Sequence, residues 1–260
     1  METVSEALIL MAGSGSRLRV GSTSTIKPLT PVLGRPLISY VFEALVRGGI
    51  KKVCAVVGFQ RKSLIEQLNS LTPRELEVVF VENPDWQKQN GISVLAAAKC
   101  VAPPFFLTMS DHLFDQAIID LLFRHAGTDQ LNVAIDRKCD SIFDLDDAMK
   151  VQTSGDRVVA IGKQLTRYDS IDTGLFVCPG DFFDYLESAK HGGDCSLADG
   201  VRAMARDEKV RAIDIGDAWW QDVDTPQMLA AAENHLRSRP GRDSSASIGT
   251  NTEAREPAKD

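Results

Sequence analysis

Short apolar runs alternate with segments of helical periodicity over the first 136 residues of the chain. The runs are rich in Val, Ile, Leu and Phe and are bounded by Gly, Asp or Asn, which is typical of buried strands. The strands predicted in this way are 7–13, 53–58, 78–82, 105–110 and 131–136. Segments 36–49 and 115–127 between them predict amphipathic helices; in the first, Leu37, Tyr40, Val41, Ala44 and Leu45 form the apolar stripe. Strand and helix in alternation predict a mostly parallel sheet covered on both faces.

The pattern changes after residue 136. Segments 147–152, 155–162 and 171–178 predict short antiparallel strands, and 181–189 and 196–205 predict helices. A further strand is expected at 210–216, and a closing helix at 225–238 begins with Thr225 as N-cap and Pro226 at the first helical position. The whole pattern predicts an α/β fold, a Rossmann-like three-layer sandwich with a mostly parallel mixed sheet and a small β insertion.

One domain over residues 1–238 is the simplest division of this chain. Residues 239–260 contain a single large aliphatic residue and no aromatic residue. Such a segment buries too little apolar surface to offset the entropy lost on ordering, so we expect a disordered tail.

Composition narrows the classes of function. The chain has 260 residues, 43% hydrophobic and 25% charged, a net charge of -7 and a pI near 5.2. An acidic chain argues against nucleic-acid binding, which needs a basic face. No apolar stretch approaches the roughly 20 residues of a membrane span, and the acidic N-terminus is unlike a signal peptide, so we expect a cytoplasmic protein without membrane insertion.

The cysteines are odd in number and form no C-x-x-C pair, which argues against a disulfide framework and a thiolate zinc site. Most of them lie in or beside apolar segments, so we expect reduced core residues. They are Cys54, Cys100, Cys139, Cys178 and Cys195.

A glycine-rich turn directly follows the first predicted strand, over residues 13–16. Backbone N–H groups in such a turn hold phosphate at the carboxyl edge of a parallel sheet. The dinucleotide fingerprint would need glycine where Leu18 stands, and the P-loop would need a G-K-[ST] that is missing. What remains is G-x-G-[ST]-R followed by K-P-L, in which Arg17 and Lys27 can reach the phosphates of a nucleoside triphosphate.

The stretch "MAGSGSRL…IKPLTPV" resembles the signature of the sugar-phosphate nucleotidylyltransferase superfamily, with Met11 where alanine is more usual. Further similarity lies in "ENPDWQKQNGISVLAAAK", "LTMSDHLFD" and "WWQDVDTPQML". The patterns I-G-K-x-L, D-x-x-D-T-G and W-x-D-V-D-T resemble the CTP:inositol-1-phosphate cytidylyltransferases. The resemblance covers roughly residues 7–237 and implies the nucleotidyltransferase fold, with the β insertion on the acceptor side.

The reaction implied is attack by an acceptor phosphate on the α-phosphorus of CTP, with pyrophosphate leaving and Mg²⁺ as cofactor. Catalysis then consists of positioning and charge neutralisation. Lys27 would contact the α-phosphate and Arg17 the leaving pyrophosphate. Asp111, at the carboxyl end of a predicted strand, would bind metal. Asp222 and Asp224 would supply the second metal ligand, with Asp224 preferred.

The resemblance also implies the binding residues. Those for the nucleotide are Met11, Ala12, Gly13, Ser14, Gly15, Ser16, Asn90, Gly91, Ser93 and Ser110. Those for the acceptor are Lys163, Asp172, Thr173, Gly174 and Arg137, with Lys138 beside the last. His112 is expected to support the site or to pack, because neighbours on a strand face opposite sides.

Three alternatives to this function are considered. The acceptor could be a phosphonate, a phosphocholine-like phosphate or a sugar 1-phosphate, and the base is not readable. An inactive nucleotide-binding regulatory module would not need Arg17, Lys27, Asp111 and Asp224 together. A dehydrogenase is disfavoured by the glycine missing at position 18. The remaining expected partners are a second copy of the chain and a separate membrane phosphotransferase that uses the product.

Overall fold

The computed structural model describes residues 3–18, 26–125 and 129–239. The expected tail lies outside the described residues, except for Arg239. The strands are β1 Glu6–Met11, β2 Pro31–Val32, β3 Arg35–Pro36, β4 Lys52–Val57, β5 Glu77–Glu82, β6 Phe105–Met109, β7 His112–Phe114, β8 Leu131–Asp136, β9 Lys150–Ser154, β10 Arg157–Gly162, β11 Ser170–Cys178, β12 Val210–Asp214 and β13 Trp220–Asp222. The α-helices are α1 Leu37–Arg47, α2 Arg61–Leu71, α3 Asn90–Ala96, α4 Gln116–His125, α5 Phe182–Ser188, α6 Leu197–Arg206 and α7 Pro226–Ser238.

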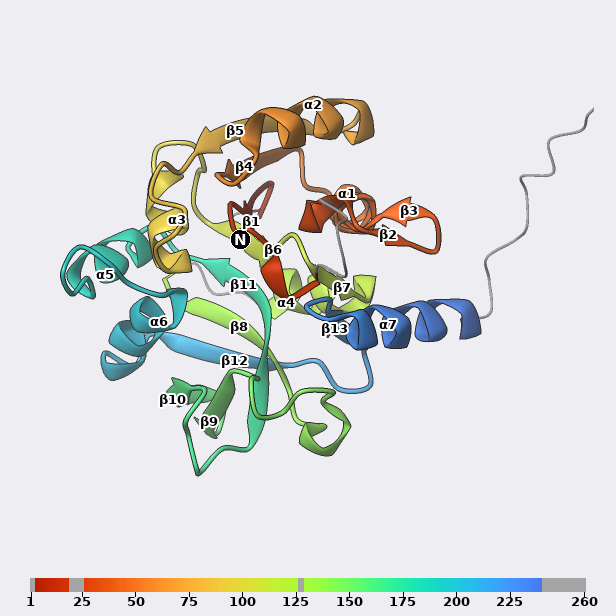
Figure 1. Cartoon of the computed structure of the whole chain (residues 1–260). Coiled ribbons are helices and arrows are strands. Elements are labelled where there is room, and N and C mark those ends of the chain that lie inside the picture. Colours follow the sequence, from red (N-terminus) through yellow and green to blue (C-terminus); the bar gives the residue numbers. More distant parts are fainter. Residues whose placement is uncertain (1–2, 19–25, 126–128, 240–260) are drawn as a thin grey trace, which may run out of the picture.

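Nine strands of the described chain form one mixed sheet in the order β5-β4-β1-β6-β11-β8-β12-β10-β9 (Figure 1). The neighbours β5, β4, β1 and β6 are parallel, as are β8 and β12. Strand β11 lies between β6 and β8 and is antiparallel to both. The small sheets β13-β7 and β2-β3 stand apart from the main one. The predicted α/β class with a mixed sheet is confirmed, and its parallel pairs lie mainly in the β5-β4-β1-β6 half while antiparallel pairs prevail in the other half.

The region expected as a β insertion is continuous with the main sheet. Strands β9 and β10 pair with each other and form its last edge, while β11 also pairs with β9. The carboxyl half of β11, Leu175–Cys178, is buried on both faces, as a central strand requires. Strand β11, which is distant from β6 in sequence, therefore lies beside β6 at the end of the first half of the sheet.

Successive side chains along a strand point to opposite faces of the sheet and pack into two separate hydrophobic cores. In β1, Ala7 and Ile9 pack on one face and Leu8 and Leu10 on the other. Helices α1, α2, α4 and α7 contribute to the first core, and α3, α5 and α6 to the second. Figure 1 shows α3, α5 and α6 together on one side of the sheet and α1, α4 and α7 on the other. The predicted three-layer arrangement follows from this division.

Two predicted helices show how local signals and packing combine. Helix α7 begins as expected, with the Thr225 hydroxyl accepting a hydrogen bond from the Met228 N–H at 3.2 Å. Such a cap contributes about 1 kcal/mol. In α1 the buried stripe is rotated from the predicted one: Ile38 and Phe42 are fully buried, whereas Tyr40 is half-buried. Tyr40 donates its hydroxyl to the Val32 carbonyl at 2.8 Å, so its ring lies at the border of the core.

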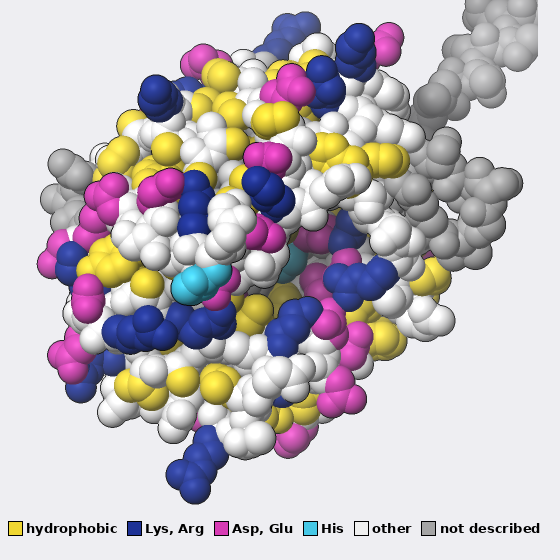
Figure 2. Space-filling view, turned by 60° about the vertical axis from the view of Figure 1, so that its left-hand side comes forward, with side chains coloured by type: hydrophobic (Ala, Val, Ile, Leu, Met, Phe, Trp, Pro, Cys, Tyr) yellow, Lys and Arg dark blue, Asp and Glu magenta, His cyan; other side chains and the backbone are white. Residues whose placement is uncertain are grey.

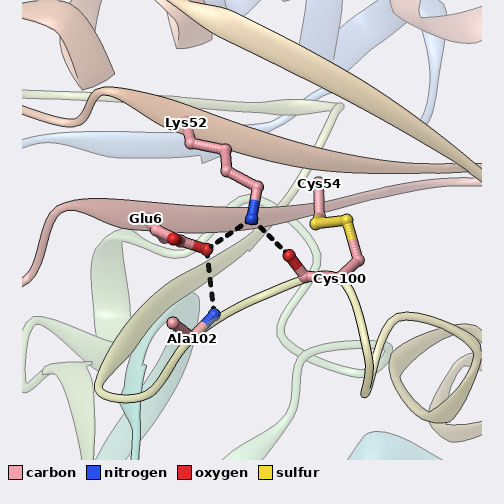
Figure 3. Close-up of a disulfide and its surroundings, with 5 residues drawn as sticks. All are labelled: Glu6, Lys52, Cys54, Cys100 and Ala102. Carbon is pink, nitrogen blue, oxygen red and sulfur yellow. Dashed lines mark hydrogen bonds and ion pairs between the residues drawn. A yellow bond between two sulfur atoms is a disulfide. The ribbon is translucent and has the colours of Figure 1, made fainter.

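The expectation of reduced cysteines is wrong for one pair. Cys54 in β4 and Cys100, between α3 and β6, form a disulfide, as Figure 3 shows. Beside it, Lys52 Nζ donates to Glu6 Oε2 at 3.0 Å and to the Cys100 carbonyl at 2.5 Å. The two cysteines are 46 residues apart, and an odd count without a C-x-x-C pair could not reveal which of them meet in the fold. Cys178 and Cys195 are free and buried, as predicted.

Candidate active site

The predicted phosphate-binding turn lies where β1 leaves the sheet, facing the segment after β6. Gly15 has φ +60, the left-handed conformation that favours glycine. A Cβ at Gly15 would lie 2.5 Å from Lys27 Cβ, so the absent side chain is what lets Lys27 approach the turn. The turn glycine therefore positions a cation as well as an anion-binding backbone.

Lys27 lies between two carboxylates that the sequence predicted separately. Its ammonium donates to Asp111, after β6, and to Asp224, after β13. All three side chains are largely buried, at 12%, 18% and 14% exposed respectively. Burial alone would favour neutral forms, but the opposite charges outweigh it: the pKa of Lys27 is raised and the pKa of Asp111 is held well below its usual range.

Arg17 connects this cluster to the far side of the site. It donates to Asp224 Oδ2 at 2.6 Å and to Asp147 Oδ2 at 2.7 Å. The other oxygen of Asp147 accepts from Lys163 Nζ at 2.5 Å. The hydrogen bond to Asp147 and the nearby carboxylates raise the pKa of Arg17. Asp147, which sequence reasoning missed, thus bridges the cation expected for pyrophosphate and the one expected for the acceptor phosphate.

His112 contacts Asp111 and packs in the site, in line with the supporting or packing role expected for it. Its Nδ1 lies 2.6 Å from Asp111 Oδ1, and its ring stacks on Trp220 with 6.2 Å between centroids. Burial would lower the pKa of His112, but Asp111 raises it above the ordinary value. A Cβ at Gly174, which has φ +75, would overlap the His112 ring. Gly174 is therefore needed for the packing of His112 in this site.

Two cavities meet at these residues. The glycine-loop cavity, of about 270 Å³, is lined by Gly13, Gly15, Ser16, Lys27 and Ser110, among others. The large cavity, of about 420 Å³, extends from Arg17 to β11 and the 138–149 segment. Both are lined by Arg17, Asn90, Met109, Asp111 and Asp224. Figure 2 shows acidic and basic side chains gathered around a hollow on one face, in keeping with this charged lining.

Most of the predicted nucleotide residues line the glycine-loop cavity. They are Met11, Gly13, Gly15, Ser16, Asn90, Ser93 and Ser110, together with Trp86 and Lys88. Ala12 and Gly91 do not line it: Ala12 is buried, and a Cβ at Gly91 would meet the Cys195 carbonyl at 2.6 Å. Ser14 belongs to the same turn but is also absent from the lining.

On the acceptor side the structure brings some of the predicted residues to the large cavity and places others away from it. Lys163, Asp172 and Gly174 line the large cavity. Thr173 is fully buried and donates its hydroxyl to the Ala134 carbonyl at 2.9 Å, because neighbours on β11 face opposite ways. Arg137 pairs with Asp169 and Asp214 outside the cavity, while its neighbour Lys138 lines it.

Carboxylates dominate the polar lining of the large cavity. Burial raises the pKa of Asp172 to about 7, and its Oδ1 accepts the Gly174 N–H at 2.8 Å. Asp136 accepts from Trp220 Nε1 at 2.9 Å. Burial and the charges of Asp224 and Asp111 raise the pKa of Asp222, despite the opposing effect of His112. Such groups can accept hydrogen bonds from a polyhydroxy ligand.

Asp111 and Asp224 fit a divalent cation. They approach the same ammonium and so face one point where positive charge is held. Two carboxylates, completed by phosphate oxygens and water, are what Mg²⁺ typically takes. Over residues 3–18, 26–125 and 129–239, no group of three or more His, Cys, Asp or Glu side chains is arranged for a metal. Asp222, at the end of β13, lines the large cavity together with Asp111 and Asp224 but does not share their pairing with Lys27.

The fold and this arrangement of cations and carboxylates at the carboxyl edge of the sheet define an enzyme that transfers nucleotidyl groups. Residues 7–143 match the MobA-like NTP transferase domain, and the chain belongs to that family. The resemblance to nucleotidylyltransferases is thus confirmed.

Curated relatives are similar over most of this chain. A protein named bifunctional IPC transferase and DIPP synthase from Rubrobacter xylanophilus is 36% identical over 87% of the chain and 51% of the relative. Its namesake from Thermococcus kodakarensis is 33% identical over 88% and 50%. The chain therefore spans about half the length of the curated relatives it matches.

Solved structures agree with the fold. The inositol-1-phosphate CTP transferase from T. maritima has a TM-score of 0.81 and 26% identity, covering 91% of this chain and 96% of its own. A UDP-glucose pyrophosphorylase from Acinetobacter baumannii has a TM-score of 0.72 at 19% identity, covering 90% and 93%, a likeness of fold alone. In the part of the chain that the structure describes, no helix has the length and apolar character to cross a membrane.

Proposed function

We propose that the protein transfers CMP from CTP to a phosphorylated polyol, with inositol 1-phosphate as the acceptor and pyrophosphate as the second product. The observation that carries this proposal is the meeting of two cavities at Arg17, Asp111 and Asp224. One cavity has the glycine turn suited to phosphates, and the other has carboxylates suited to hydroxyl groups. The names of the similar proteins support cytidine as the base and inositol as the polyol.

The chemistry needs no protein nucleophile. A phosphate oxygen of the acceptor forms a bond to the α-phosphorus, and the bond from that phosphorus to the pyrophosphate oxygen breaks. Lys27 neutralises charge on the α-phosphate, and Arg17 does so on the departing pyrophosphate. Mg²⁺ held by Asp111 and Asp224 would supply further charge neutralisation for two anions that repel each other.

Asp147 pairs with two of the cations that the substrates are proposed to use. In the described structure it holds both Arg17 and Lys163. These pairs are exposed by 40% or more, so each is worth little and phosphate can replace the carboxylate. Asp172 and Asp136 in the large cavity would then accept hydrogen bonds from acceptor hydroxyls, and Lys163 and Lys138 would hold the acceptor phosphate. A separate membrane phosphotransferase as the consumer of the product remains part of this proposal.

The test is pyrophosphate release with Mg²⁺, measured with CTP, UTP, dTTP, ATP and GTP against a panel of acceptors. The panel holds inositol 1-phosphate, glucose 1-phosphate, phosphocholine and 2-hydroxyethylphosphonate. We expect signal with CTP and inositol 1-phosphate. Signal with CTP and another acceptor would refute the acceptor assignment, and signal only with another nucleotide would refute the cytidylyl assignment.

Asp111→Asn tests the metal assignment, with Asp120→Asn on the surface of α4 as a matched control. Loss of one electrostatic contact of this kind typically lowers kcat by roughly 10²–10³-fold. We expect at least that loss for Asp111→Asn, measured at a temperature where circular dichroism shows the variant to be folded, and full activity for the control. Activity of Asp111→Asn within about tenfold of wild type would refute the role of Asp111.

A further inference from the structure

A third cavity, of about 390 Å³, lies among α1, β7 and the end of α7. We call it the arginine cavity, because Arg35, Arg47 and Arg239 line it. Its volume is within the range of roughly 300–1,000 Å³ that is usual for small-molecule sites. None of these arginines takes part in the chemistry described above.

Positive charge prevails in the arginine cavity. Glu43 is the one carboxylate among its described lining residues, and it divides its two oxygens between Arg35 at 3.0 Å and Arg47 at 2.5 Å. Arg239 pairs with Asp115, which is not part of the lining. A guanidinium carries five N–H donors in a planar fork, so each arginine can hold a phosphate beside its carboxylate partner. The lining therefore suits an anion with several oxygens.

Flat rings stand beside these cations. The Arg35 guanidinium lies 4.6 Å from the centroid of Tyr40, and that of Arg239 lies 5.9 Å from the centroid of Trp219. Phe114 adds a third aromatic side chain to the lining. Trp219 already stacks on His235, with 4.0 Å between centroids, and Arg35 lies over Tyr40, so a planar ring would stack on the guanidinium planes or lie against Phe114. A ligand with both a planar base and phosphates matches both features.

The arginine cavity also adjoins the catalytic cluster. His112 and Trp219 line both this cavity and the large cavity. The other side of His112 holds Asp111, at 2.6 Å between Nδ1 and Oδ1. A molecule in the arginine cavity would therefore contact the residue that orients the proposed metal ligand.

We propose that the arginine cavity binds a nucleoside diphosphate, and that its occupancy changes turnover at the active site through His112. This site is distinct from both substrate cavities, and its binding step does not depend on the proposed reaction.

The test compares the number of CDP molecules bound, by isothermal titration calorimetry, in wild type and in the double variant Arg35→Gln/Arg239→Gln. Arg61→Gln on α2 is the matched control, since Arg61 is also an exposed arginine, 44%, in one ion pair. We expect the double variant to bind one CDP fewer than wild type, or to bind it at least tenfold more weakly, and the control to match wild type. Should the double variant unfold, the single variants are each expected to weaken that same site.

Kinetics give the second readout. Where activity is present, CDP is expected to change the wild-type rate in a way that saturating nucleotide substrate does not remove, and to act only competitively on the double variant. A wild type that binds no CDP, or a folded double variant that keeps the wild-type number of sites and affinity, would overturn the binding proposal. The same type of CDP inhibition in wild type and in the double variant would overturn the coupling through His112. Failure of the inositol assignment would leave the binding result untouched.

Discussion

Replacing Lys27 by methionine tests the cluster that joins the two substrate cavities. The side chain keeps most of its length but loses the charge that lies between Asp111 and Asp224, and the three native side chains are each less than a fifth exposed. The two buried carboxylates then lose the cation between them, and only Arg17 beside Asp224 and His112 beside Asp111 remain to offset their charge. Breaking a buried ion pair by removing one partner costs about 3–5 kcal/mol.

For a chain of this size each kcal/mol shifts the melting temperature by roughly 2–4 °C, so Lys27→Met is expected to melt about 6–20 °C below wild type. Lys163→Met is the control, because Lys163 is 44% exposed in its pair with Asp147 and such pairs contribute about 0–1 kcal/mol. The assay is thermal unfolding followed by circular dichroism near pH 7 without metal.

Adding Mg²⁺ separates the electrostatic explanation from a packing defect. With the ammonium gone, the two carboxylates can bind the metal without competition from Lys27, so Mg²⁺ should raise the melting temperature of Lys27→Met more than that of wild type. A melting temperature of Lys27→Met within about 2 °C of wild type would refute the reasoning. An equal effect of Mg²⁺ on both proteins would refute the shared cation position.

Three further outcomes are expected. Burial raises the pKa of Asp172 to about 7, so its contribution to stability is fully present below its ordinary pKa of 3.8 and is lost as pH rises through 7. The free energy of unfolding, measured with urea, should therefore fall less between pH 5 and pH 8 for Asp172→Asn than for wild type. An equal fall in the two proteins would contradict this prediction. Thr173→Val should lower the free energy of unfolding by about 1–3 kcal/mol, because the hydrogen bond to the Ala134 carbonyl is lost, and should leave KM for the acceptor unchanged. A raised KM would indicate that Thr173 contacts the acceptor. Cys100→Ser should lower the free energy of unfolding by about 2–4 kcal/mol. A reductant should lower the stability of wild type by a similar amount and leave the variant unchanged. A wild type whose stability does not respond to a reductant would contradict this prediction.

Local patterns along the chain were enough to predict most of the elements and the class of protein. Strand segments such as 53–58 and 131–136 were readable because a strand buried on both faces needs a continuous apolar run. That the turn at residues 13–16 and Lys27 lie together could be predicted because they are close in sequence. The position of Asp111 could also be predicted, since the end of a parallel strand can be located from the apolar run before it.

Only the tertiary structure decided which residues act together. Asp111 and Asp224, far apart in sequence, pair with the same Lys27 ammonium, and Asp147 reaches Arg17 across 130 residues of chain. Strand alternation placed Thr173 in the core beside Asp172, but the sequence did not show which neighbour faced the cavity.

The Cys54–Cys100 disulfide and the contact of Gly174 with His112 likewise join residues that only the tertiary structure brings together. The amino-acid sequence determines the local conformation at each of these positions through periodicity, turns and caps. Which side chains meet depends on strand order and register, and these are set by the packing of the whole chain around its two cores.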